Sequence, residues 1–234
     1  MVFLAYNQSM ESGNNFSETP VALKGSEVNM DENPYNPLEH PVLIVISGPS
    51  GVGKDTVVRN ILQKRDDFHF VITATDRPAR ADEIDGVDYF FLTTENFERM
   101  IEAGEFLEHA VVHDCYKGVP KWQIREALNS GRDVIMRVDP QGAATLRRLI
   151  PEATFIFLLA ESEKELSERL KARNSETSVS FDLRMEITKE ELKRIDEFDY
   201  CVVNRSGRVQ EAVEQILAIV TAERCRVGRP PIIL

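Results

Sequence analysis

The sequence has few cysteines, and their placement excludes the architectures that depend on them. Cys115, Cys201 and Cys225 are the only three in 234 residues, and no two of them form a Cys-x-x-Cys pair. A disulfide framework needs an even set at regular spacings, and a zinc ribbon needs paired thiolates. Because neither is indicated, a reducing compartment is the simpler interpretation.

Basic residues are also in short supply. Lys and Arg number 28 against 39 Asp and Glu, which gives a formal net charge of −11. A protein that coats nucleic acid or an anionic membrane carries an excess of positive charge, so neither partner is expected. The balance does not exclude a compact pocket of arginines, because net charge does not report local charge.

Long apolar runs are missing as well, and no stretch approaches the roughly 20 residues that span a membrane. The first forty residues contain six acids and only one base, Lys24. Transit peptides, in contrast, are rich in Arg and poor in acids. The Asn, Ser, Gly and Pro content of this segment, without an apolar period, predicts a disordered acidic tail over residues 1–40.

From Pro41 onward, predicted strands and helices alternate. Apolar runs predict strands at 42–46, 70–74, 133–138, 154–159 and 200–203. Periodic or charged segments predict helices from Gly53 onward and at 122–128, 143–149, 163–170, 179–195 and 209–226. Such alternation indicates an α/β fold, a parallel sheet with helices on both faces.

Two segments interrupt this alternation. Between residues 77 and 112 the apolar pattern shortens, with strand-like pieces at 88–92 and 106–112 around a helix at 96–101. This indicates a subdomain inserted into the sheet. The polar stretch 174–180 lies between two charged helices and predicts a mobile lid. The helix before it opens with Ser162 and Glu165, the spacing of a capping box.

The sharpest motif directly follows the first predicted strand. It reads Gly48-Pro49-Ser50-Gly51-Val52-Gly53-Lys54-Asp55-Thr56 and leads into a helix. Glycines let consecutive backbone N–H groups point at phosphate oxygens, and the helix N-terminus adds its positive end. Lys54 supplies a point charge for the terminal phosphates. The motif predicts a nucleoside triphosphate site.

Asp55 departs from the common pattern Gly-x₄-Gly-Lys-Ser/Thr, because it stands where a hydroxyl normally binds Mg²⁺. A carboxylate there either repels the triphosphate or, as a hard oxygen anion, holds Mg²⁺ or its water shell. Thr56 offers a hydroxyl one residue later. Since the rest of the loop is intact, we favour the second interpretation, with Asp55 or Thr56 as the metal ligand.

Further motifs resemble those of guanylate kinases. They are Asp76-Arg77-Pro78-Ala79-Arg80-Ala81-Asp82-Glu83, Gly86-Val87-Asp88-Tyr89-Phe90, Gly104-Glu105-Phe106-Leu107-Glu108, Val138-Asp139-Pro140-Gln141-Gly142, Arg169-Leu170-Lys171-Ala172-Arg173 and Val202-Val203-Asn204. The resemblance covers residues 41–228 and leaves 229–234 as a C-terminal tail. It implies a P-loop NTPase-type sheet, a nucleoside monophosphate (NMP)-binding insertion at about 76–120 and a lid at about 173–184.

The loop and the run from Arg137 to Arg148 look most like the organellar plant subtype and some bacterial relatives. That resemblance implies a chloroplast or mitochondrion. The cytoplasm stays open as an alternative, because no transit peptide is evident.

The resemblance also implies an activity, transfer of the ATP γ-phosphate to GMP with Mg²⁺ bound to ATP; dGMP is a second acceptor to consider. Arg77, Arg80 and Tyr89 match the residues that hold the GMP phosphate. Glu108 matches the residue that recognises guanine, because a carboxylate can accept hydrogen bonds from the two adjacent N–H groups of that base. The remaining implied roles are the GMP side for Thr73 and Asp139, the phosphoryl cage for Lys54, Arg77, Arg169, Arg173 and Arg184, and adenine for Asn204.

Some positions differ from the family pattern. Lys117 and Val119 stand where many guanylate kinases have a Tyr and a Ser or Thr, and Arg137 stands where many have an Asp. Two other functions stay open: a ribose bisphosphate phosphokinase on the same fold, and a non-catalytic guanylate-kinase-like module that binds phosphopeptides. Arg169 and Arg173 also fit a solvated, salt-bridged helix face. The chain could act as a monomer or a homodimer.

Overall fold

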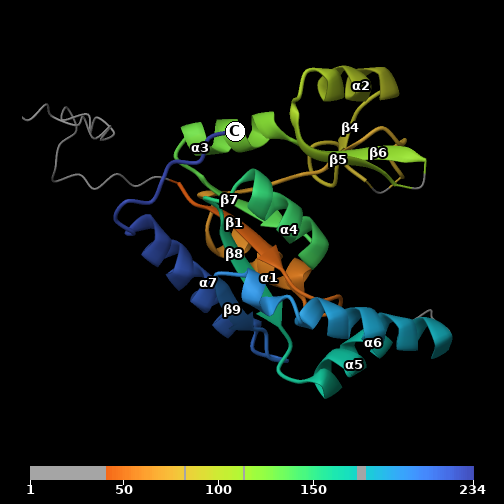
Figure 1. The fold of residues 1–234 in the computed structure, drawn as a ribbon, viewed down its shortest axis with the longest axis vertical. Helices are drawn as coiled ribbons and strands as arrows, with labels where there is room; N and C mark the ends of the chain where they lie inside the picture. The colour runs from red at the N-terminus through yellow and green to blue at the C-terminus, as the bar shows by residue number, and fades with distance from the viewer. Residues whose placement is uncertain (1–40, 82, 113, 173–177) are drawn as a thin grey trace, which may run out of the picture. The chain divides into compact units, whose positions relative to one another are not determined.

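The computed structural model describes residues 41–81, 83–112, 114–172 and 178–234 (Figure 1). The predicted acidic tail, Arg173 and most of the predicted lid segment 174–180 therefore lie outside the described residues. Within the described part of the chain, no helix is long and apolar enough to cross a membrane.

The described residues form strands and helices in alternation. The strands are β1 (Leu43–Ser47), β2 (Phe68–Phe70), β3 (Ala74–Thr75), β4 (Phe90–Phe91), β5 (Phe106–Val112), β6 (Cys115–Pro120), β7 (Asp133–Arg137), β8 (Thr154–Leu159) and β9 (Tyr200–Val203). The helices are α1 (Lys54–Lys64), α2 (Thr94–Glu102), α3 (Lys121–Asn129), α4 (Pro140–Leu149), α5 (Glu163–Ala172), α6 (Ser178–Leu192) and α7 (Val209–Arg224), with a 3₁₀ turn η1 (Ile195–Glu197).

The central sheet has the order β2-β7-β1-β8-β9, and all of its pairings are parallel. Its middle strand β1 is an uninterrupted apolar run, and all 5 of its residues are buried. A strand buried on both faces is what such a run favours. The predicted α/β fold with a parallel sheet is confirmed.

Helices cover both faces of this sheet, as predicted. Consecutive strand residues point to opposite faces, so Ile44 and Ile46 of β1 pack with α1 and α7, for example on Val57 and Val213. On the other face, Leu43 and Val45 pack with residues of α3 and α4. The central core is therefore two apolar layers separated by one sheet.

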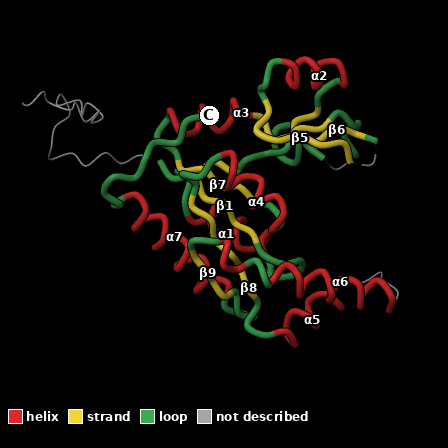
Figure 2. The backbone as a smooth tube through the Cα atoms, in the orientation of Figure 1, coloured by secondary structure: helices red, strands yellow, loops and turns green. Residues whose placement is uncertain are grey.

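A second sheet, of order β4-β3-β6-β5, is built by residues between 74 and 120 (Figure 2). The chain thus leaves the central sheet after β2 and returns to it at β7. Helix α2 packs on this sheet through Phe97, whose ring centroid lies 4.2 Å from that of Phe106 and 5.1 Å from that of Tyr116. The second sheet has its own small apolar core.

The predicted strand at 70–74 is wrong as a single element, because β2 ends at Phe70 and β3 begins at Ala74 in the other sheet. The buried side chain of Gln123 spans the gap. Its amide N–H donates to the Ile72 carbonyl at 2.7 Å, and its oxygen accepts from the Ile72 N–H at 2.8 Å. A side chain thus replaces a strand partner where the chain changes sheets.

Other element boundaries also differ from the prediction. The strand-like piece at 88–92 shortens to β4, and β6, which pairs antiparallel with β5, was not predicted. The long helix predicted to Ile195 ends at Leu192. Half of the capping box forms: the Ser162 hydroxyl accepts from the Glu165 N–H at 3.2 Å, but the Glu165 carboxylate accepts from the Glu161 N–H.

Residues 229–234 carry no helix or strand, but they contact the domain. Ile232 and Leu234 pack against the apolar layer under α3 and α4. The Leu234 carbonyl accepts from Arg125 at 3.1 Å, and Arg229 donates to the Pro41 carbonyl at 3.0 Å. The two ends of the folded unit are therefore tied to it by hydrogen bonds.

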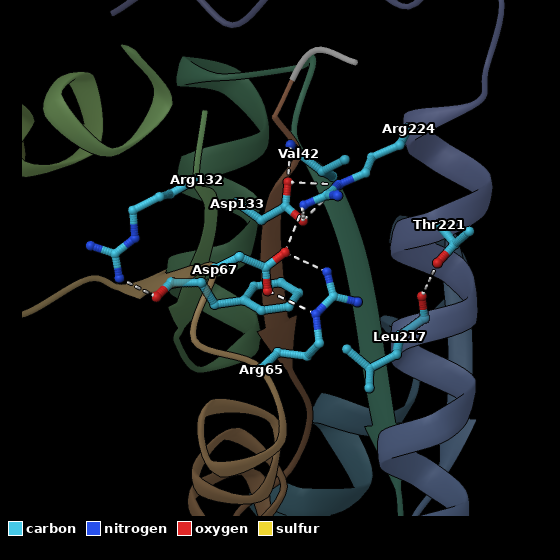
Figure 3. Close-up of polar contacts among 9 residues, drawn as sticks. Val42, Arg65, Asp67, Arg132, Asp133, Leu217, Thr221 and Arg224 are labelled. Carbon is cyan, nitrogen blue, oxygen red and sulfur yellow. Dashed lines mark hydrogen bonds and ion pairs between the residues drawn. The ribbon is translucent and has the colours of Figure 1, made fainter. Parts of the chain in front are cut away.

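A buried carboxylate joins the amino ends of the sheet strands to α7 (Figure 3). Asp133 is fully buried at the start of β7. Its carboxylate accepts from the Val42 N–H at 2.8 Å and from the Arg224 guanidinium at 2.6 Å. Arg224 also bonds Asp67 at 3.2 Å, and Asp67 pairs with Arg65. These two arginines lower the pKa of Asp67.

We expect Arg224→Ala to destabilise the fold by about 3 kcal/mol, because removal of one partner leaves a buried charge uncompensated. The measurement is urea unfolding at pH 7. Lys193→Ala, which removes an exposed pair with Glu190, is the matched control and should cost less than about 1 kcal/mol. Equal small losses for the two variants would contradict a structural role for the Asp133 network.

Candidate active site

The glycine-rich loop connects the end of β1 to α1 in a shape that only glycine permits at two positions. Gly48 has φ 137°, and a Cβ there would lie 2.2 Å from the Leu158 carbonyl oxygen. Gly53 has φ 92°, and its Cβ would lie 2.5 Å from the Asn204 side-chain nitrogen. Residues with a side chain rarely adopt such φ values. Because there is no room for a Cβ, the loop backbone packs directly against β8 and the residue that follows β9.

The loop surrounds a small cavity at the carboxyl edge of the sheet. This cavity, of about 210 Å³, is lined by Ser50, Gly51, Gly53, Lys54, Asp55 and Arg137. The Lys54 ammonium donates to the carbonyls of Gly48 and Pro49, the latter at 3.0 Å. The backbone geometry and the lysine together make a cationic pocket of the kind that binds phosphate.

Oxygen donors that suit Mg²⁺ lie at the same place. The Asp55 carboxylate lines the cavity from the first turn of α1, and Thr56 follows it on the exposed side of that helix. A carboxylate beside a phosphate site matches the hard oxygen ligands that Mg²⁺ takes when it arrives with a nucleotide. These residues therefore fit the ion by their ligand type, and Asp55, which lines the cavity, also forms an ion pair with Arg137.

Asn204 and Arg169 hold the loop from behind. The Val52 carbonyl accepts from the Asn204 side-chain amide at 2.8 Å and from the Arg169 guanidinium at 3.1 Å. Arg169 also donates to the Asn204 carbonyl at 2.8 Å and to Glu165 at 2.6 Å. Asn204, predicted at the adenine, and Arg169, predicted in the phosphoryl cage, are thus both brought to the loop. The pair with Glu165 is a salt bridge along the face of α5, which the sequence analysis gave as the alternative interpretation of Arg169.

A second cluster gathers on the loop before β4. The Arg77 guanidinium donates to both carboxylate oxygens of Glu83, at 2.7 and 2.6 Å, and lies 4.9 Å from the Tyr89 ring centroid. The Arg80 backbone N–H donates to the same carboxylate at 2.8 Å, and the residue itself is exposed. Two of the three residues predicted to hold a phosphate therefore contact the Glu83 carboxylate, Arg80 only through its backbone, and the third, Tyr89, contacts Arg77.

Glu83 belongs to the quoted motif but was not predicted as a site residue. Its bidentate pair with Arg77 lowers its pKa to about 2. A planar guanidinium held between a carboxylate and an aromatic ring is fixed in orientation. The motif spacing alone could not show this contact, because it depends on the turn in which the Glu83 N–H donates to the Arg80 carbonyl at 3.1 Å.

Glu108 and Asp139 come from different sheets. Glu108 lies on β5 and is partly buried, and burial raises the pKa of its carboxyl, with a smaller contribution from the charge of Asp139. Asp139 follows β7 and caps α4, since its carboxylate accepts from the Gly142 N–H at 2.7 Å. Thr73 lies between β2 and β3, and its carbonyl accepts from the Phe90 N–H at 3.0 Å.

Glu191, near the end of α6, is a site residue that the sequence analysis missed. Burial raises the pKa of its carboxyl, against the opposing effects of Lys54 and of the Ser50 backbone N–H. It therefore faces the phosphate loop from the helix that follows the predicted lid. Arg184 falls within the same helix.

A larger cavity, of about 960 Å³, lies elsewhere, among Thr154, Tyr200 and Arg226 at the other end of β8 and β9. It contains none of the predicted site residues. In parallel α/β sheets, ligands bind at the carboxyl ends of the strands, so the smaller loop cavity is the better candidate. The parallel sheet and the loop with Lys54 define the class of the protein, a P-loop NTPase-type nucleotide-binding fold.

Comparison with known proteins gives the family. The guanylate kinase family model matches residues 40–223. The chain is 50% identical over 197 residues to guanylate kinase 2, chloroplastic/mitochondrial, of Oryza sativa subsp. japonica, covering 84% of this chain and 69% of that protein. It is 40% identical to the guanylate kinase of Clostridioides difficile (strain 630), covering 80% of this chain and 91% of that protein. The chain therefore belongs to the guanylate kinase family.

A solved structure agrees with this assignment. The crystal structure of guanylate kinase from Anaplasma phagocytophilum matches with a TM-score of 0.61 and 27% identity, covering 82% of this chain and 90% of that one. The similar structure thus belongs to the same family that the sequence comparison gives.

We expect the Glu83 carboxyl to titrate with a pKa of about 2, measured by NMR of its side-chain carbon. Arg77→Ala should return this pKa toward about 4.3, the value of an unpaired Glu. Because the folded pKa is lowered, the stabilising contribution is complete above the unfolded pKa and is lost as the pH falls toward 2. An unchanged pKa in Arg77→Ala would contradict the pairing, and Arg99→Ala on α2 is the control.

Proposed function

We propose that this chain transfers the γ-phosphate of ATP to GMP, giving ADP and GDP. The observation that supports the proposal most strongly is the intact phosphate loop with Lys54 at the carboxyl edge of a parallel sheet, in a chain of the guanylate kinase family. Phosphoryl transfer needs no covalent residue on the protein. It needs two aligned nucleotides and neutralisation of the charge that spreads over the moving group.

On the acceptor side, Arg77, Arg80 and Tyr89 would hold the GMP phosphate. The pair with Glu83 fixes the orientation of Arg77 before the acceptor binds. Glu108 would accept from the ring N–H and the exocyclic amine of guanine. Adenine offers no such pair of donors, so it would leave a partly buried carboxylate without its hydrogen bonds. Thr73 and Asp139 would complete this side.

On the ATP side, the backbone N–H groups of the loop up to Gly53, which exclude Pro49, would bind the phosphates, and Lys54 would reach the terminal ones. Bound Mg²⁺ would supply charge neutralisation on the phosphate oxygens, held by Asp55 with Thr56 as the second candidate. Arg169 supports the Val52 carbonyl, and with Arg173 and Arg184 it would complete the cage. Exclusion of water on lid closure would prevent hydrolysis. Asn204 would lie beside the adenine.

The two alternative functions are less well supported. The curated relatives quoted above are guanylate kinases over most of this chain. A ribose bisphosphate phosphokinase has no use for a guanine-reading carboxylate at Glu108, and a non-catalytic module has no need of Lys54.

Location, further partners and assembly are also proposals. The relative from Oryza sativa carries the description chloroplastic/mitochondrial, which supports an organellar location here. We propose dGMP as a second acceptor, because the contacts proposed above address the base and the phosphate rather than the sugar. The net charge of −11 disfavours a nucleic-acid or membrane partner. Either a monomer or a homodimer is compatible with a site built within one chain.

The direct test is a coupled phosphotransfer assay with GMP, dGMP, AMP, UMP and ribose bisphosphate. We expect turnover with GMP, and Lys54→Ala should lower the rate about 100-fold with every active acceptor. Glu108→Ala should lower kcat/KM for GMP about 10- to 100-fold, because a charged hydrogen bond is lost. An absence of GMP turnover by the wild type would overturn the function. A GMP preference unchanged in Glu108→Ala would overturn the guanine assignment.

The pH dependence of GMP binding gives a separate test. The raised pKa of Glu108 means that its carboxylate begins to take up a proton at higher pH than an ordinary Glu. We therefore expect the KM for GMP to rise more steeply in the wild type than in Glu108→Gln, which does not titrate, as the pH is lowered from neutral. The GMP phosphate titrates in both assays, so its effect on KM is the same in the wild type and the variant. Parallel profiles would contradict the assignment.

A further inference from the structure

Two residues that depart from the family pattern contact each other. Asp55 stands where the phosphate-loop pattern has a hydroxyl, and Arg137 stands where many guanylate kinases have an Asp. In the structure the Arg137 guanidinium forms an ion pair with the Asp55 carboxylate. In this chain the acidic group thus lies on the loop helix, and a base lies at the end of the strand.

The sheet register explains why these residues meet. Arg137 is the last residue of β7 and pairs with Ile46 of β1, two residues before the phosphate loop. The loop then turns, and the first turn of α1 returns Asp55 to the same edge. The guanidinium also lies 5.8 Å from the ring centroid of Phe70 on β2. Both charged residues line the loop cavity.

Fold stability does not account for this pair. The side chains of Arg137 and Asp55 are 40% and 49% exposed, and ion pairs of that exposure contribute little to stability. The carboxylate, however, lies in the first turn of α1, whose positive end is the part of the loop that favours a phosphate. When no metal ion is bound, an Asp55 carboxylate without Arg137 would occupy that field and would repel a polyphosphate in the same cavity.

We propose that Arg137 is a positioning residue for the nucleotide: it neutralises Asp55 and thereby allows the carboxylate-bearing loop to bind polyphosphate. The inference rests on the proposed function, since the polyphosphate is that of the ATP or ADP used by the kinase. Arg137 acts through Asp55. The two positions are therefore coupled: the loss of nucleotide affinity on replacement of Arg137 should depend on whether Asp55 is present.

The test is a double-mutant cycle on ADP binding, measured by calorimetry with EDTA so that no metal takes part. We expect Arg137→Gln to weaken ADP binding about tenfold, because it leaves the Asp55 charge uncompensated. Asp55→Asn should bind ADP at least as tightly as the wild type. The double variant, Asp55→Asn with Arg137→Gln, should lie within about threefold of Asp55→Asn alone.

Arg59→Gln is the matched control, because Arg59 lines the neighbouring cavity from α1 together with Asp55 and Arg137. We expect it to change ADP affinity less than threefold. An equal loss in Arg59→Gln would mean that only the general positive field matters, and additive effects in the cycle would mean that the two residues act independently. Either result would overturn the proposal.

Thermal unfolding and the acceptor assay complete the test. We expect Arg137→Gln and Arg59→Gln to have similar melting temperatures; a selective fall for Arg137→Gln that the double variant does not reverse would indicate a structural role and overturn the proposal. The ADP measurement involves no acceptor. Coupling without GMP turnover would therefore refute the kinase assignment alone, and GMP turnover without coupling would refute the role of Arg137 alone.

Discussion

The support of the Val52 carbonyl determines the shape of the phosphate loop. This oxygen accepts hydrogen bonds from the Asn204 side chain and from Arg169, so the end of β9 and helix α5 both hold the middle of the loop. Close approach is possible because Gly53 leaves room for the Asn204 amide. Backbone N–H groups fixed in this way need no reorganisation when a phosphate binds, which is the condition for strong electrostatic stabilisation.

Three arginines of the candidate site are each paired with a carboxylate. Arg77 pairs with Glu83, Arg137 with Asp55 and Arg169 with Glu165. Such pairs orient the guanidinium groups and limit their mutual repulsion. The chain as a whole has a net charge of −11, yet arginines and Lys54 gather near the phosphate loop and the loop before β4. Three of the acidic residues lie beside these arginines, one carboxylate for each guanidinium.

The elements whose burial follows from local sequence could be predicted. Strands β1, β7, β8 and β9 are short apolar runs, and their positions were predicted to within a residue or so because a doubly covered parallel strand needs such a run. The run at 70–74 gave a wrong single strand, since its partner at Ile72 is the side chain of Gln123. No local pattern reports a contact between residues about 50 positions apart.

The site shows the same division. The phosphate loop and Lys54 are contiguous in the sequence, so their role could be inferred from spacing and from the strand and helix on either side. The contacts of Glu83, Glu191 and Arg137 could not, because each depends on the geometry of a turn, a helix end or a strand register that the motif spacing does not report. Asp55 was recognised as a departure from the pattern, but its partner became evident only from the pairing of β1 with β7.

Tripolyphosphate binding to Asn204→Ala tests most directly the claim that the phosphate loop is preorganised by its support at Val52. The probe has no adenine, so it reports on the loop rather than on a base contact. The account predicts about tenfold weaker binding than in the wild type, with faster hydrogen exchange of the loop amides and unchanged affinity for GMP. Unchanged tripolyphosphate affinity with unchanged exchange would contradict it.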